Sequence, residues 1–305
     1  MRLAITHETR YSYSPAVQTA QHVAHLQPAD TPCQKVLSHS LHVEPAASVL
    51  HNVDAYCNHR AYWALNNPHD GLLVRACSEI ETSEIEQAKA TQSWESVREH
   101  FRYHGGLPAD VNNGFVFGSH HAPVHEAFTA YAQSSFTPGR ALMPAALELT
   151  ARMHRDFTYA SQSTDINTPA LEALESKRGV CQDFAHILLA CLRSLGLPAR
   201  YVSGYLLTQP PPGQPRLVGS DASHAWASVY LPELASHACQ GWLDLDPTNN
   251  RTGLASPGLD YVRLAVGRDF ADVSPLRGVL QGGGEHTLDV AVTVAPLDAS
   301  LSAAD

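Results

Sequence analysis

The chain has 305 residues, of which 44% are hydrophobic and 16% are charged, and its formal net charge at pH 7 is −10. This composition is typical of a folded globular protein, and the length allows two domains. Because an acidic chain has no general attraction to phosphate backbones, we expect no nucleic-acid partner.

The sequence also gives an expectation for the cellular location of the protein. No apolar run approaches the roughly 18 residues of a membrane-spanning helix, and the opening MRLAITHETRYSYSP lacks the apolar segment of a secretory signal. We therefore expect a cytoplasmic protein with no membrane partner. The chain has six cysteines and no CxxC pair, so we expect no disulfide framework in a cytoplasmic protein. Five of the six are expected to be small buried core residues. These five are Cys33, Cys57, Cys77, Cys191 and Cys239.

Residues 1 to about 90 are predicted to form an antiparallel β domain. Short alternating or apolar runs, separated by Pro, Asn, Asp and Gly, occur in RLAITHETRYSYS, SHSLHVEPAAS, HRAYWALNN and GLLVRACSEIET. Their spacing is typical of a small sandwich or barrel.

Residues 91–305 are predicted to form a second domain of mixed helix and strand. Helical patterns occupy SWESVREHF, ALMPAALELTARMHRDF and TPALEALES, and a loop rich in Gly, Asn, His and Pro separates the first two. In TPALEALES, Thr168 is a candidate N-cap and Pro169 follows at the first turn. The runs ARYVSGYLL, SHAWASVYL and GWLDLDPT indicate strands, and HTLDVAVTVAPL indicates a C-terminal β segment.

A cysteine opens the most regular helical pattern. Gly196 ends this pattern, and Cys181 falls on its inward face at the first turn. A helix N-terminus stabilises a thiolate through its dipole and its free N–H groups. Gly179 allows a close approach of the chain, so Cys181 is a candidate nucleophile as well as a candidate core residue. The apolar stripe consists of Phe184, Ile187, Leu188, Cys191, Leu192 and Leu195.

Two predicted strands carry the partners that such a nucleophile needs. In SHAWASVYL, His224 shares a face with Trp226, and in GWLDLDPT the side chains of Asp244 and Asp246 share a face. If the strands are antiparallel neighbours, the histidine can meet an aspartate there. A helix bearing Cys181, packed over that face, would complete a Cys–His–Asp set of nucleophile, proton carrier and orienting carboxylate.

Together, RGVCQDFAHILLACLRSLGLPARYVSGYL, SHAWASVYL and GWLDLDPTNN resemble the core of the transglutaminase-like superfamily. The segments FTY and NTPALEALESKRGVC resemble the region before its nucleophile, and HETRYSYSPAVQTAQHVAHLQP and YVRLAVGRDFADVSPLRGV resemble its bacterial members. The resemblance covers most of the chain. It implies an α+β fold with an N-terminal antiparallel β domain over residues 1–90. Residues 91–305 then form a papain-like core, whose nucleophile helix packs on an antiparallel sheet, with a C-terminal β segment.

Carried over to this chain, the resemblance implies Cys181 as nucleophile, His224 as base and Asp246 as orienting carboxylate. It favours Asp246 because the family's carboxylate stands immediately before the turn. The Cys181 N–H is then one oxyanion donor, and Tyr159 is a candidate for the second. The rival carboxylates are Asp244, Asp221 and Asp183, the last of which is also expected to cap the helix start.

The activity that the resemblance implies is acyl transfer at an amide through a thioester. We expect hydrolysis of a peptide or protein amide, as by a cysteine protease or amidase, because the sequence contains no dedicated amine site. The alternatives are protein-glutamine transamidation and a non-catalytic binding or scaffold module with an idle triad.

Some features depart from the family or invite another interpretation. Cys57 replaces an expected Phe-Gly-Asn type turn, and HLQP lacks a basic residue before its proline, but neither touches the triad. We expect no metal or cofactor, because the chain has no EF-hand loop and its histidine cluster lacks partners at zinc spacing. QGGGEH lacks the Walker lysine and is predicted to be a turn. The histidine cluster comprises His120, His121 and His125.

Overall fold

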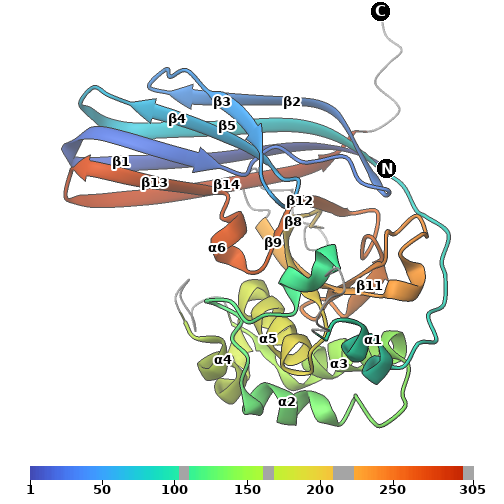
Figure 1. Ribbon diagram of the computed structural model, residues 1–305. Helices are drawn as coiled ribbons and strands as arrows, with labels where there is room; N and C mark the ends of the chain where they lie inside the picture. The colour runs from blue at the N-terminus through green and yellow to red at the C-terminus, as the bar shows by residue number, and fades with distance from the viewer. Residues whose placement is uncertain (103–109, 161–167, 209–222, 298–305) are drawn as a thin grey trace, which may run out of the picture.

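The computed structural model describes residues 1–102, 110–160, 168–208 and 223–297. A β domain lies at one end of the molecule and a group of helices at the other (Figure 1). A second, five-stranded sheet lies between them, so the chain has the α+β architecture that the sequence predicts.

The first sheet has the order β2-β5-β1-β4-β3, and β1 belongs to both of its halves. The first part of β1 pairs with β5 and the last part pairs with β4. Trp63 and Leu65 of β4 pack in one cluster with Leu72 and Val74 of β5, as expected for a sandwich. The strands are β1 (Arg2–Ala24), β2 (Gln34–Glu44), β3 (Leu50–Val53), β4 (His59–Leu65) and β5 (His69–Thr82).

The C-terminal strands β13 (Leu276–Gly282) and β14 (Glu285–Pro296) complete this first sheet. Strand β14 pairs with residues 3–14 of β1, and β13 pairs with residues 17–24. The sequence predicts that this segment belongs to the second domain, whereas its hydrogen bonds join it to the first sheet. Of the glycine-rich QGGGEH, predicted to be a turn, only Gly283 and Gly284 lie outside the strands, and they link β13 to β14. The domain boundary near residue 90 stays a prediction.

The second sheet has the order β11-β10-β9-β8-β12 and is antiparallel throughout. In it, Trp242 lies opposite Tyr230 and Asp244 lies opposite Ser228, which confirms that the two motif-bearing strands are antiparallel neighbours. Its strands are β8 (Ala199–Leu206), β9 (Ser223–Tyr230), β10 (Trp242–Asp246), β11 (Arg251–Leu254) and β12 (Tyr261–Gly267).

The predicted helices are present, with two differences. Pro169 occupies the N-cap position of α4 in extended backbone, so the prediction of Thr168 as N-cap is wrong. Helix α2 lies inside the predicted loop, where His125 caps its start by accepting the Ala127 N–H at 3.2 Å. No helix in the described ranges is long and apolar enough to cross a membrane. The helices are α1 (Trp94–His100), α2 (Glu126–Gln133), α3 (Leu142–Asp156), α4 (Ala170–Ser176), α5 (Cys181–Ser194) and α6 (Phe270–Val273).

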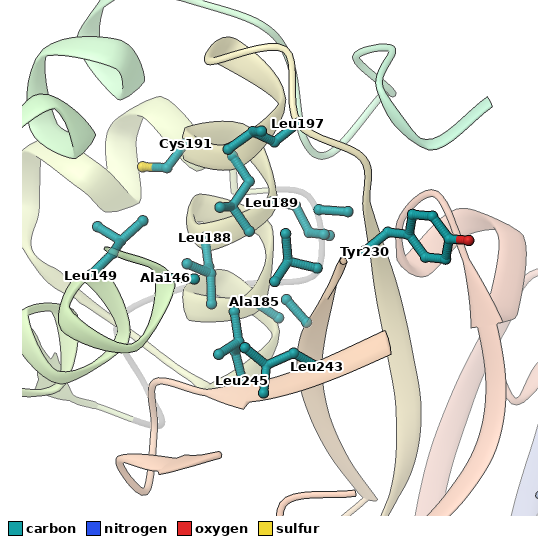
Figure 2. Packing of buried hydrophobic residues seen from close by; sticks show 14 of the residues in the cluster. Ala146, Leu149, Ala185, Leu188, Leu189, Cys191, Leu197, Tyr230, Leu243 and Leu245 are labelled. Atoms are coloured by element: carbon teal, nitrogen blue, oxygen red, sulfur yellow. The ribbon is translucent and has the colours of Figure 1, made fainter. Parts of the chain in front are cut away.

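Helix α5 is buried around almost its whole circumference rather than on one face. Figure 2 shows Leu188 and Leu189 packed among side chains of the surrounding elements, including Leu149 and Leu245. Ala185, outside the predicted stripe, is also fully buried. The helix is enclosed because other helices cover the side that faces away from the sheet (Figure 1). This packing holds Cys181 at a fixed position relative to β9.

The sandwich is attached to the second sheet by an apolar contact. Leu3 and Ile5 of β1 are buried in one cluster with Tyr205 of β8 and Val262 of β12. Burial of such side chains stabilises the contact by about 1.5–3 kcal/mol per residue. This contact holds the face of β1 and β14 that packs on the second sheet beside the start of α5.

Candidate active site

Cys181 is the first residue of α5 and is partly exposed. The helix start is capped as predicted, because the Val180 N–H donates to Asp183 Oδ2 at 2.8 Å. A Cβ added at Gly179 would lie 2.6 Å from that same Oδ2, so only glycine fits there without a rearrangement. The sequence around Cys181 therefore fixes the thiol at the positive end of a buried helix.

His224 and Asp246 form a buried pair. His224 Nε2 lies 2.7 Å from Asp246 Oδ2, and the two side chains are 8% and 0% exposed. The Cys181 side chain also hydrogen-bonds to the His224 ring. Because Asp246 occupies Nε2, Nδ1 remains for the thiol. The three residues carried over from the resemblance are thus brought together in space, while their catalytic roles stay predictions.

The environment of His224 favours its protonated form. Burial by itself lowers the pKa of His224, but the hydrogen bonds to Asp246 and Cys181 and the nearby negative charges outweigh it. Together they raise the pKa of His224 from 6.5 to about 10. The imidazole is therefore a cation at neutral pH, positioned to stabilise a thiolate on Cys181.

Asp246 is held by residues that the sequence pattern does not indicate. Its Oδ2 accepts from the Tyr261 hydroxyl at 2.6 Å and from Asn249 Nδ2 at 2.8 Å, and its Oδ1 accepts from the Thr248 N–H at 2.8 Å. Burial raises the pKa of Asp246, yet the bonds from His224, Tyr261 and Asn249 lower it below its ordinary value. Asn249 stands in the quoted DPTNN motif, whereas Tyr261 has no local signal because it lies on another strand.

The rival carboxylate Asp244 serves a different side chain. It accepts from Trp226 Nε1 at 3.0 Å and from the Ser228 hydroxyl, and both donors are buried. The Trp226 ring stacks on His224 with ring centroids 6.0 Å apart. Asp244 therefore hydrogen-bonds to Trp226, which in turn stacks on His224. The third rival, Asp221, lies outside the described residues.

Replacing Asp244 by alanine is expected to destabilise the fold by about 3 kcal/mol, because two buried donors lose their acceptor. Buried Arg200 also loses the nearby opposite charge of Asp244. Urea unfolding of the variant measures the effect. Ser228→Ala, which removes only one donor, should cost about 1 kcal/mol. An unchanged unfolding midpoint in Asp244→Ala would show that the carboxylate is not needed for packing.

A cleft of about 370 Å³ opens beside Cys181 and His224, and both sheets line it. The second sheet and its neighbours contribute Tyr201 and Phe270, while β1 and β14 contribute residues such as Tyr11 and Leu288 from the sandwich. The cleft is therefore formed between the two parts of the chain rather than within one of them.

The other residues that the sequence singles out lie in different environments. Tyr159 is 54% exposed, and burial together with the charges of Cys181 and Asp183 raises its pKa, so it lies near the thiol. Its oxyanion role stays a prediction. His121 stacks on His186, and within the described ranges no three His, Cys, Asp or Glu side chains are grouped to hold a metal ion. The prediction of five buried cysteines is wrong for Cys57, which is exposed in the link between β3 and β4, and for Cys77 of β5, which is partly exposed.

Comparisons with known proteins show which family and which fold the chain resembles. Residues 3–81 match the bacterial transglutaminase-like N-terminal region, and residues 129–247 match the transglutaminase-like superfamily. An uncharacterised protein of Mycobacterium tuberculosis is 38% identical over 304 residues, which cover 97% of this chain and 93% of that protein. The crystal structure of a candidate cysteine protease from Cytophaga hutchinsonii has the same fold, with a TM-score of 0.74 at 21% identity, over 99% of this chain and 92% of that one.

A shorter match extends to a protein with a named activity. A protein-glutamine gamma-glutamyltransferase of Pseudomonas aeruginosa is 30% identical over 130 residues, which cover 41% of this chain and 19% of that protein. The matches support a family of cysteine-based acyl-transfer proteins and do not distinguish hydrolysis from transamidation. The chain belongs to the transglutaminase-like superfamily and carries the N-terminal region of its bacterial members.

Proposed function

We propose that the protein is a cysteine-dependent enzyme that hydrolyses a peptide or protein amide. The observation that carries the proposal is the buried His224–Asp246 pair, hydrogen-bonded to a thiol at a helix N-terminus and open to a cleft. An idle binding module has no need of a buried ion pair at this place, because such a pair costs desolvation.

The proposed reaction has two steps. Cys181 sulfur attacks the amide carbonyl, the C–N bond breaks, and the His224 imidazolium gives its proton to the leaving amine. Water then attacks the thioester, His224 takes a proton from it, and the C–S bond breaks to release the acid and restore Cys181. Asp246 holds the imidazole in orientation throughout, and Tyr261 and Asn249 hold Asp246.

Transamidation is the second candidate, and the match to the Pseudomonas aeruginosa glutamyltransferase favours it. In that case a primary amine replaces water in the second step. Hydrolysis is preferred because the described residues that line the cleft include no carboxylate that would hold a cationic amine.

A panel of glutamine-containing peptides and peptide amides, incubated with and without a fluorescent alkylamine, tests the proposal. We expect free acid by mass spectrometry in both conditions, with little incorporation of the amine. Predominant amine incorporation would establish transamidation instead. Absence of both products, with Cys181 reacting no faster than an ordinary thiol, would favour the idle module. Cys181→Ala is the control for background hydrolysis.

A further inference from the structure

The cleft wall opposite Cys181 is one face of the paired strands β1 and β14. Side chains alternate along a strand, so His7, Thr9 and Tyr11 share a face. Across the pair, Thr9 lies opposite Val290 and Tyr11 lies opposite Leu288. All five side chains line the cleft.

This apolar face continues beyond the part that the second sheet covers. On the same face of β14, Val292 and Val294 are 2% and 0% exposed, because both belong to the apolar contact between the two sheets. Val290 and Leu288 are the next two side chains on this face toward the start of β14, and they are 46% and 53% exposed. The uncovered aliphatic side chains thus begin where the cleft begins. A substrate bound at Cys181 would cover them.

The wall is also neutral. No Asp, Glu, Lys or Arg occurs among the described residues that line the cleft. Burial lowers the pKa of His7 to about 4, so this residue is uncharged at neutral pH. Its ring nitrogens are paired with the Tyr205 hydroxyl at 3.0 Å and the Thr9 hydroxyl at 3.3 Å. A charged substrate group placed against Tyr11, Leu288 and Val290 would lose its water without gaining a counter-charge from these side chains.

We propose that this wall, formed by Tyr11, Leu288 and Val290, selects substrates with a large aliphatic or aromatic side chain next to the reacting carbonyl. The inference rests on the proposed function, because it takes Cys181 as the attacking group. It assigns the sandwich domain to substrate recognition. Burial of the substrate side chain against these residues supplies the discrimination, and one methylene more or less in such a site changes the rate by about tenfold or more.

Short peptidyl chloromethyl ketones that end in Leu, Phe, Asp or Lys test the proposal on the whole protein. In each, the Cys181 sulfur displaces chloride and a C–S bond forms, so mass spectrometry gives the labelling rate. We expect the Leu and Phe probes to label Cys181 at least about tenfold faster than the Asp and Lys probes. Iodoacetamide, which has no side chain, serves as the reference for thiol reactivity.

Two exposed aliphatic residues provide a matched pair of variants. Leu288→Asp should slow the Leu and Phe probes about tenfold and leave iodoacetamide labelling unchanged. Val279→Asp should behave as wild type, because Val279 is 76% exposed on β13 and is not among the cleft residues. Equal rates for all four probes, or no effect of Leu288→Asp, would overturn the inference while fast iodoacetamide labelling leaves the proposed function intact. Slow iodoacetamide labelling of Cys181 would instead overturn both.

Discussion

Replacing Cys181 by serine is expected to reduce turnover of an amide substrate by on the order of 10⁴-fold or more. A serine hydroxyl is far less acidic and less nucleophilic than a cysteine thiol, so the attacking group is lost. Product formation under single-turnover and steady-state conditions measures the effect. Cys181 is partly exposed and packs only at the edge of the core, so the variant should keep its fold.

Cys57→Ser is the matched control for this substitution, because Cys57 is exposed and does not line the cleft. It should retain full activity. Circular dichroism and urea unfolding of both variants separate a chemical effect from a structural one. Retention of activity in a folded Cys181→Ser protein would remove the thioester mechanism.

Replacing His224 by alanine is expected to abolish the reactivity of Cys181 at low pH. With its pKa raised to about 10, His224 carries a positive charge throughout the range from pH 5 to 9. Without that neighbouring positive charge a thiolate on Cys181 is no longer stabilised by the histidine, so the labelling rate at pH 6 should fall by roughly 100-fold or more. The difference from wild type should narrow as the pH approaches 9.

Iodoacetamide labelling across this pH range, followed by peptide mass for all six cysteines, measures the effect. The five other cysteines act as internal references, and their rates should not change. Asp246→Asn keeps the shape of the site while removing the carboxylate charge, and should give a smaller loss than His224→Ala. If Cys181 in His224→Ala still labels rapidly at pH 6, the histidine is not what activates it.

The contacts of the site were predictable where they follow from alternation along a strand. His224 and Asp246 meet because their positions on β9 and β10 place them on one face of antiparallel neighbours. The choice between Asp244 and Asp246 was not decided by alternation, since both lie on that face. The structure separates them, because Trp226 and Ser228 engage Asp244.

Other features depended on which elements meet, and a local pattern does not contain that information. The apolar stripe of α5 predicts one buried face, but helices from elsewhere in the chain cover the opposite face and bury Ala185 as well. Likewise, alternation predicts a strand at residues 286–297 but not its partner. Hydrogen bonding to β1 is a contact between residues more than 270 positions apart. The apolar wall of the cleft was hidden from sequence analysis for the same reason.

The pairing of β14 with β1 also sets the order in which the molecule can be assembled on the ribosome. Strand β1 emerges before the other strands of its sheet, and the edge that β14 later occupies does not gain β14 until residues 285–296 have been synthesised. Cys181 and His224 emerge well before that strand. During synthesis, therefore, the proposed nucleophile and its histidine exist before the cleft does. The pairing of β14 with β1, which completes the β domain, also adds Leu288 and Val290 to the cleft beside Cys181.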